Sequence, residues 1–128
     1  MAITNLTDDL KEAMLGRLDP TRTIVDTGLE KVILLDRDEL EYDPGGIYGG
    51  FKDITWLSSG DTGYEEGTLK QDADLIFDVE ANIRISGYKI YHNDGTTSTV
   101  GITQLTSEYV FDEDGTFTIS NIEITLGW

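Results

Sequence analysis

The sequence is 128 residues long, 38% hydrophobic and 27% charged, which fits one compact domain able to bury a core. Its formal net charge of −16 disfavours binding to nucleic acid phosphates and to anionic membranes, and it favours cationic partners or bound cations. The last Lys or Arg is Lys89, so the charged side chains that follow it are all carboxylates. We therefore expect an acidic surface wherever this last segment lies.

Cysteine is absent from the sequence. This excludes disulfide bonds, zinc sites built on thiolates and cysteine nucleophiles. The amino terminus lacks a basic stretch followed by an apolar one, and no apolar run reaches the length of a transmembrane helix. We expect a protein that is synthesised in a cytoplasm, is not secreted by a signal peptide and does not enter a membrane.

Residues 1–19 are predicted to form an amphipathic helix. Apolar side chains recur there at spacings of three and four positions, which places them on one face: Leu6, Leu10, Ala13, Met14 and Leu18. Asp8 and Asp9 suit the positive end of the helix dipole, and Asp19-Pro20 marks the end of the helix. A helix this short needs a docking surface. Leu10 and Met14 are therefore candidate contacts, either with the protein's own sheet or with a neighbouring subunit.

The remainder of the single domain, residues 22–128, is predicted to form strands and turns. Residues 23–29 and 31–36 are candidate strands, and the second is apolar enough to be buried. Two polar stretches that contain several glycines predict long loops near residues 37–50 and 58–73. A short strand around Trp56 separates the two loops, and we expect the tryptophan ring to lie in the core.

The clearest strand pattern runs from Leu75 to Ile85, where apolar and polar residues alternate. The alternation changes parity at Ser86-Gly87, which predicts a β-bulge, and again at Ser120-Asn121. Asn93-Asp94-Gly95 predicts a turn between these points. Strands that bend and change facing are typical of chains that pass between two packed sheets. The sequence thus predicts a mainly β fold, a small antiparallel β-sandwich with one N-terminal amphipathic helix.

The stretch FDEDG, residues 111–115, resembles a calcium-binding loop. Aligning Gly115 with the glycine of an EF-hand places Val110 at the first position and Asn121 at the last, where the motif needs carboxylates. A looser calcium site that uses Asp112 or Asp114 stays open as an alternative. We favour an ordinary hairpin turn in which Gly115 adopts the left-handed conformation.

No catalytic or cofactor-binding residues emerge from the sequence. His92 is the only histidine, and it precedes a predicted turn, so we interpret it as an exposed turn residue. The dense acidic run Asp36 to Asp43 contains no feature that distinguishes a catalytic carboxylate pair from a solvated loop, and we interpret it as a solvated loop. Phosphate-binding glycine motifs are absent as well. Trp128 at the last position is a third candidate for a partner interface, since tryptophan is common among interface anchors.

Both ends of the chain resemble small virion structural proteins of tailed bacteriophages. The opening MAITNLTDDLKEAMLGRL at residues 1–18 has the Met-Ala-x-Thr-Asn start and short helix of such proteins. Residues 87–128 resemble the last part of such proteins, with a segment GYKIYHNDGTTSTVGIT and a closing hairpin YVFDEDGTFTISNIEITLGW. The resemblance implies a non-enzymatic capsid decoration protein or minor tail or neck protein with a β-sandwich core. It also implies localisation to the virion and either a homo-oligomer or contacts with coat or tail proteins.

Two other functions remain alternatives to a structural subunit. In a receptor- or carbohydrate-binding module of a tail tip, aromatic side chains of the two long loops would form a platform: Tyr42, Tyr48, Trp56 and Tyr64. The second alternative is an acidic DNA mimic, an inhibitor whose net charge of −16 would attract the basic surface of a DNA-binding enzyme. A hydrolase that uses two carboxylates is favoured by no specific feature.

Overall fold

The computed structural model describes residues 2–3, 29–65, 68–92, 95–96, 98 and 100–125. Over these residues the fold is mainly β with antiparallel sheets, as the sequence predicts, and the same residues form no helix. In that part of the chain there is accordingly no helix with the length and apolar character needed to cross a membrane. The strands are β1 (Ala2–Ile3), β2 (Leu29–Asp36), β3 (Lys52–Asp53), β4 (Thr68–Lys70), β5 (Leu75–Val79), β6 (Arg84–His92), β7 (Thr103–Val110), β8 (Gly115–Ile119) and β9 (Glu123–Thr125).

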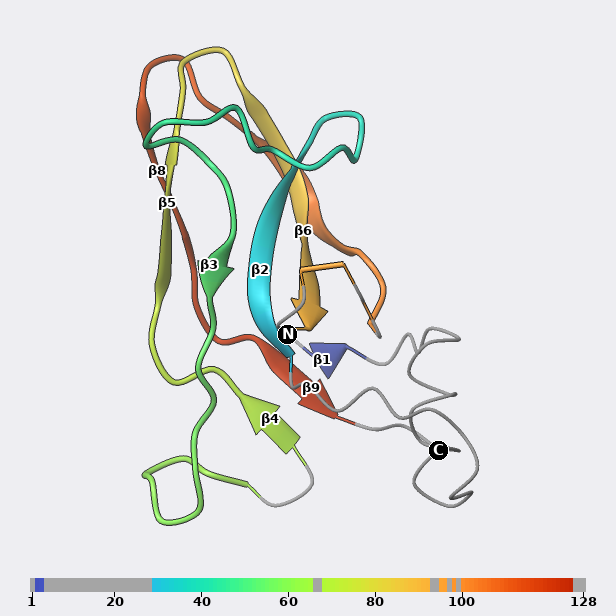
Figure 1. Ribbon diagram of the computed structural model, residues 1–128, viewed down its shortest axis with the longest axis vertical. Helices are drawn as coiled ribbons and strands as arrows, with labels where there is room; N and C mark the ends of the chain where they lie inside the picture. The colour runs from blue at the N-terminus through green and yellow to red at the C-terminus, as the bar shows by residue number, and fades with distance from the viewer. Residues whose placement is uncertain are drawn as a thin grey trace.

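The strands form three hydrogen-bonded groups (Figure 1). A four-stranded antiparallel sheet has the order β3-β2-β6-β7. β5 pairs with β8 and β4 pairs with β9, both antiparallel, and β1 adds to β9 in parallel. Since β4 leads into β5 and β8 leads into β9, the two antiparallel pairs follow one another along one two-stranded ribbon. We call residues 68–79 and 115–125, which contain these four strands, the long ribbon.

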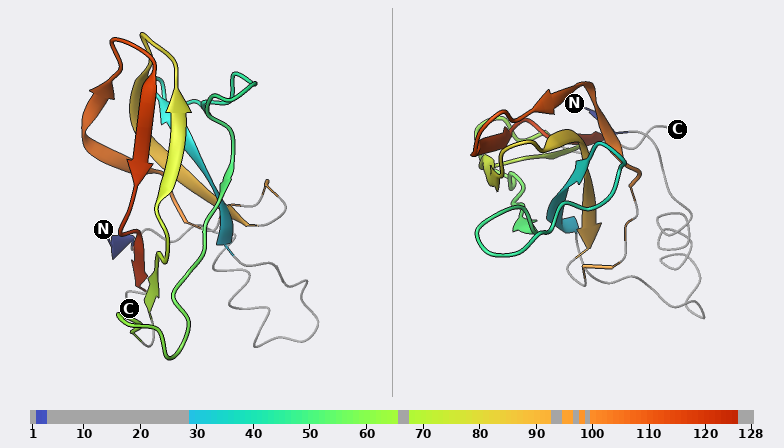
Figure 2. Two further views of the ribbon diagram at one scale, coloured as in Figure 1. Left: turned by 90° about the vertical axis from the view of Figure 1, so that its left-hand side faces the viewer. Right: turned by 90° about the horizontal axis from the view of Figure 1, so that it is seen from above.

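The long ribbon and the four-stranded sheet lie in separate layers (Figures 1 and 2). Two short connections carry the chain between the layers at one end of the molecule. The first arch, residues 80–83, joins β5 to β6, and the second arch, residues 111–114, joins β7 to β8. Main-chain hydrogen bonds hold the arches side by side, because Asn82 N donates to Phe111 O at 2.6 Å and Phe111 N donates to Ile83 O at 2.9 Å.

The core is built from alternate residues of both layers. The ribbon contributes Leu75, Phe77, Val79, Ile119, Ile122 and Ile124, and the four-stranded sheet contributes Val32, Leu34, Ile85, Tyr88 and Ile90. β2 is buried on both faces, because Ile33 and Leu35 point away from this core and are also buried. The continuous apolar run of β2 predicts this burial, as in strands that are covered on both sides.

The alternation from Leu75 to Ile85 belongs to two strands and not to one, which corrects the sequence-based expectation. β5 ends at Val79 and β6 begins at Arg84, in the other layer. Between them Asn82 adopts a left-handed conformation with φ of 67°. The period-two pattern continues across the arch because Ala81 and Ile83 are half-buried there, so the pattern contains no sign of the change of layer.

The predicted bulge at Ser86-Gly87 is confirmed. On β6 the register shifts between Ile85 and Gly87 against both neighbouring strands. Gly87 lies so close to β7 that a Cβ atom there would be 2.1 Å from the carbonyl oxygen of Thr103. Glycine is therefore required by a close approach of two main chains.

The parity change at Ser120-Asn121 marks an interruption of the long ribbon. Asn121 has φ of 62°, and regular pairing stops between β8 and β9. The side chain of Gln71 spans the interruption: its amide nitrogen donates to Ile119 O at 2.9 Å, and its amide oxygen accepts from Ile122 N at 3.1 Å. Its main chain also donates to Ile122 O at 2.9 Å. One glutamine thus replaces the ladder bonds that the irregular backbone lacks.

One of the two predicted loops is confirmed, and the other is wrong in part. Residues 37–50 form an irregular loop, as predicted. The second prediction, 58–73, is wrong at its end, because Thr68–Lys70 form β4 and pair with β9. The predicted helix at 1–19 and the candidate strand at 23–29 lie almost entirely outside the described residues. Ala2–Ile3, within the first of these ranges, form β1.

Candidate functional site

The acidic stretch 111–115 is not a hairpin turn, which corrects the favoured interpretation. β7 pairs with β6 and β8 pairs with β5, so the second arch crosses between layers. Gly115 is not in the left-handed region and instead pairs with Val79 at the start of β8. Its small size matters for another reason: a Cβ atom there would lie 3.1 Å from the ring of Phe111.

Asp114 acts as a brace between three segments. One carboxylate oxygen accepts a hydrogen bond from Ala81 N at 2.8 Å, and the other accepts one from the Tyr48 hydroxyl at 2.8 Å. The bond from Ala81, followed by that from Tyr48, lowers the pKa of Asp114. Asp112 is exposed, and the described residues contain no cluster of three or more side chains suited to hold a metal ion.

Two tyrosines of the long loop 37–50 bind the arches: Tyr48 bonds to Asp114 of the second arch, and Tyr42 bonds to Glu80 of the first. Tyr42 is buried, and its hydroxyl donates to the Glu80 carboxylate at 3.3 Å and accepts from Glu80 N at 3.1 Å. Burial is the main cause of the raised pKa of Tyr42. Gly49 N donates to Asp78 O at 2.9 Å, which ties the loop to the outer edge of β5. The loop thus closes one side of the molecule.

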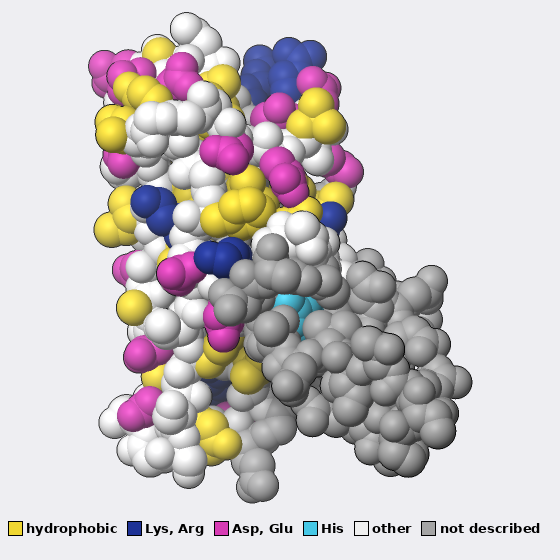
Figure 3. All heavy atoms as spheres, viewed as in Figure 1, with side chains coloured by type: hydrophobic (Ala, Val, Ile, Leu, Met, Phe, Trp, Pro, Cys, Tyr) yellow, Lys and Arg dark blue, Asp and Glu magenta, His cyan; other side chains and the backbone are white. Residues whose placement is uncertain are grey.

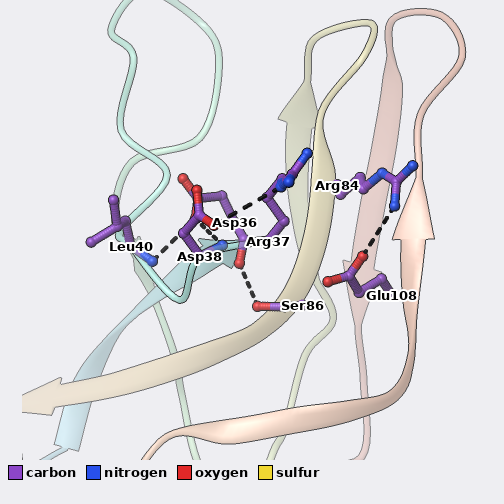
Figure 4. A network of polar contacts seen from close by, with 7 residues as sticks. All are labelled: Asp36, Arg37, Asp38, Leu40, Arg84, Ser86 and Glu108. Atoms are coloured by element: carbon purple, nitrogen blue, oxygen red, sulfur yellow. Dashed lines mark hydrogen bonds and ion pairs between the residues drawn. The ribbon is translucent and has the colours of Figure 1, made fainter.

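The acidic run Asp36 to Asp43 is partly structural and not simply solvated, contrary to the sequence interpretation. The Asp36 carboxylate accepts from the main chains of Asp38 and Leu40, at 2.8 and 3.1 Å (Figure 4). Its carbonyl accepts from the Ser86 hydroxyl at the bulge. Glu41 accepts from the hydroxyl of Tyr91, and burial together with this bond raises the pKa of Tyr91 to about 12.

The remaining sequence candidates are dispersed. His92 is the last residue of β6 and is buried, so the expectation of an exposed turn residue is wrong. Trp56 is half-buried against the core, and its indole donates to Leu29 O at 2.8 Å. Tyr64 is exposed, whereas Tyr42 is buried and cannot belong to an exposed aromatic platform. The three interface candidates, Leu10, Met14 and Trp128, lie outside the described residues.

On the other side of the molecule, the described residues leave strand edges uncovered. β7 ends one layer and β8 ends the other, and both strands lie on the same side (Figure 2). No other strand of the described residues pairs with the second edge of either one. We call the surface formed by β7, β8 and the second arch the open side. Opposite it, β3 and the loop 37–50 cover the edge of β5.

The register shows which main-chain groups face outward. The carbonyl of Asp78 accepts from Gly49, so it points away from β8, and the pair Asp78–Thr116 is not hydrogen-bonded. Hydrogen-bonded and non-hydrogen-bonded pairs alternate in an antiparallel ladder. The pair Ile76–Thr118, two residues further along, is therefore also not hydrogen-bonded. The N–H and C=O groups of Thr116 and Thr118 consequently point to the free edge of β8.

An aromatic cluster spans the gap between the two edges. Tyr109 of β7 packs on Phe111 and on Phe117 of β8, with ring centroids 4.8 and 5.8 Å apart. Tyr109 is nevertheless 54% exposed and its neighbour Val110 is 48% exposed. Below the cluster a shallow groove of about 190 Å³ runs between Tyr88 and Leu105 on one layer and Phe117 to Asn121 on the other. Exposed aromatic and apolar groups of this kind are typical of protein interfaces.

The charge of the open side is negative. Its exposed carboxylates come from Glu108, Asp112, Glu113 and Asp114, and Arg84 of β6 lies 3.6 Å from Glu108 (Figure 4). Elsewhere the acidic side chains are spread over the surface, as on the face drawn in Figure 3. The sequence alone pointed to this acidity, through the lack of Lys and Arg after Lys89. It did not point to the free edges, which depend on strand order.

Comparisons of the chain with protein-family models, with curated proteins and with solved structures find no match. The open side is therefore interpreted from its own geometry.

Proposed function

We propose that this protein is a non-enzymatic structural subunit of a tailed-bacteriophage virion, which binds neighbouring capsid or tail proteins through its open side. The observation that carries the proposal is the presence of two strand edges that no other described strand pairs with, beside an exposed aromatic cluster. Proteins usually cover or blunt such edges, because a free edge is a template for pairing with another chain. An edge with aromatic neighbours is suited to a permanent contact.

The use of the polar side chains also supports a structural role. Asp114, Glu80 and Glu41 accept hydrogen bonds that hold loops and arches together. These carboxylates therefore stabilise the fold, which is expected of a subunit that works by shape and buried area. The resemblance of residues 1–18 and 87–128 to virion proteins supports the particle as the location.

The proposal is tested by the composition of purified virions. Particles from cells that produce the wild-type protein should contain it after gradient purification, as measured by quantitative mass spectrometry. Tyr109→Ser removes the centre of the aromatic cluster and should lower incorporation by about tenfold, because aromatic anchors dominate interface energies. Leu40→Ser is the control, since Leu40 is 63% exposed on a loop outside the open side.

Two results would count against the proposal. One is a virion that lacks the protein altogether. The other is equal incorporation of Tyr109→Ser and Leu40→Ser, provided that both variants unfold at the temperature of the wild type.

A further inference from the structure

The free edge of β8 has the geometry of a strand-addition site. Thr116 and Thr118 direct their N–H and C=O groups outward, and no described residue pairs with them. Val110 on β7 does the same, because Phe111, the next residue, bonds inward to Ile83. Edges of this kind bind extended peptides through main-chain hydrogen bonds, and pockets for alternate side chains add specificity.

The long ribbon already accepts such a strand within the chain. β1 adds to the outer edge of β9, with Ala2 opposite Glu123 and Ile3 opposite Ile124. One edge of β8 pairs with β5, and the corresponding edge of β9 pairs with β4. The outer edges of β8 and β9 therefore follow one another along the same side of the ribbon. Among the described residues, this edge of the ribbon is therefore paired at β9 and unpaired at β8. A strand added to β8 would lie on the same edge of the ribbon as β1.

Charge selects the occupant. The groove beside β8 would accept apolar side chains, because Leu105, Phe117 and Ile119 line it. The exposed charged groups of β7 and the second arch, on the same open side, are Glu108, Asp112, Glu113 and Asp114. Glu108 is already paired with Arg84, and Asp114 already accepts from Ala81 and Tyr48, so Asp112 and Glu113 are the carboxylates that a partner would meet. A second copy of the chain would bring its own net charge of −16 and would be repelled. A segment of opposite charge would be attracted.

We propose that the β8 edge binds an extended segment of another protein in which basic and apolar residues alternate, and that this segment adds to β8 as a strand. The inference rests on the proposed function, because it names the mode and the chemistry of the contact through which the subunit would assemble. Apolar side chains of the segment would enter the groove beside Phe117. Its Lys or Arg side chains would meet Asp112 and Glu113 of the second arch.

The test uses the whole protein and a synthetic peptide, Lys-Val-Lys-Val-Lys-Val-Lys. Isothermal titration calorimetry should show binding of this peptide and no binding of the Glu-Val counterpart. A peptide of equal charge with N-methyl groups on alternate residues should bind about tenfold more weakly, because it lacks main-chain donors on one edge. Hydrogen exchange should show slower exchange of the Thr116 and Thr118 amides when the Lys-Val peptide is bound.

A matched pair of variants tests the edge itself. Thr118→Pro removes an N–H that points outward, so it deletes no bond to β5, and proline is tolerated on edge strands. This variant should bind the Lys-Val peptide about tenfold more weakly than Thr118→Val, which keeps the N–H. If Thr118→Pro does not fold, the N-methylated peptide decides the question with the wild-type protein.

The inference is overturned if the N-methylated peptide binds as tightly as its parent, since attraction would then depend on charge alone. It is also overturned if the Thr116 and Thr118 amides exchange at the same rate with and without the Lys-Val peptide. Either result leaves the proposed function standing where virions still contain the protein. Absence of the protein from virions would instead remove the proposed function.

Discussion

At the scale of single residues, the carboxylates that suggest chemistry in the sequence form part of the framework. Asp114 lies in the motif that resembles a calcium loop, yet each of its oxygens accepts a hydrogen bond from a different segment. Asp36 and Glu41 likewise hold the loop 37–50 in place. A brace of this kind depends on the ionised form of the carboxylate, so its contribution changes with pH.

Asp114→Asn should lower the melting temperature at neutral pH, and the melting temperature of this variant should depend less on pH than that of the wild type. The pKa of Asp114 is lowered in the fold, so its stabilising contribution is present above the unfolded pKa of about 3.9. That contribution is lost as the pH falls through the folded value. Thermal unfolding from about pH 5 to about pH 2 should therefore destabilise the wild type more than Asp114→Asn.

Asp112→Asn is the control for this prediction, because Asp112 is exposed and makes no hydrogen bond to other described residues. Identical pH profiles for the wild type and Asp114→Asn would show that Asp114 is not a brace.

Gly87→Ala should destabilise the protein by about 3 kcal/mol, at the upper end of overpacking effects. The added Cβ would lie 2.1 Å from the carbonyl oxygen of Thr103, and main-chain atoms in paired strands cannot move aside cheaply. Gly45→Ala is the matched comparison, since a Cβ there meets no atom within 4 Å and only the φ of 100° opposes it. Gly45→Ala should cost about 1 kcal/mol in urea unfolding. Equal losses for the two variants would argue against close contact at the bulge.

At the scale of elements, the long ribbon is continuous only because Gln71 bridges its interruption. Its amide replaces ladder bonds to Ile119 and Ile122 at the place where Asn121 adopts a positive φ. The ribbon carries β8 to the edge of its layer, so this one side chain also helps to position the open side.

Gln71→Met should cost about 2 kcal/mol in urea unfolding, because it leaves a carbonyl and an N–H of the ribbon without their partner. The amide of Ile122 should also exchange faster with solvent. Gln104→Met is the control: Gln104 is exposed on β7 and its amide contacts only the Glu39 side chain among the described residues, so its loss should be below about 0.5 kcal/mol. A smaller loss for Gln71→Met than for Gln104→Met would contradict the bridging role.

The sequence predicts the elements better than their partners. The apolar run 31–36 and the glycine at position 87 have local causes, so a buried strand and a bulge follow from the residues alone. The arch at residues 80–83 leaves no such signal, because half-buried Ala81 and Ile83 continue the alternation of β5 through the change of layer. Without that break the second arch also looks like a hairpin turn. The free edges of β7 and β8, and with them the open side, therefore could not be predicted.

At the scale of the whole molecule, the two sides of the layered fold differ. The loop 37–50 and β3 cover the edge of β5, whereas β7 and β8 end their layers with edges that no described strand pairs with and with an exposed aromatic cluster. The exposed carboxylates add a negative field around those edges. This asymmetry is expected of a subunit that joins a larger structure through one side.

The most direct test of this account is hydrogen exchange of the protein in intact virions compared with the free protein. We predict slower exchange in the virion at Val110, Thr116 and Thr118, the residues whose main-chain groups face edges that no described strand pairs with. The amides of residues 37–50, on the closed side, should exchange at similar rates in both states. Unchanged exchange at Thr116 and Thr118, with slower exchange confined to the closed side, would contradict it.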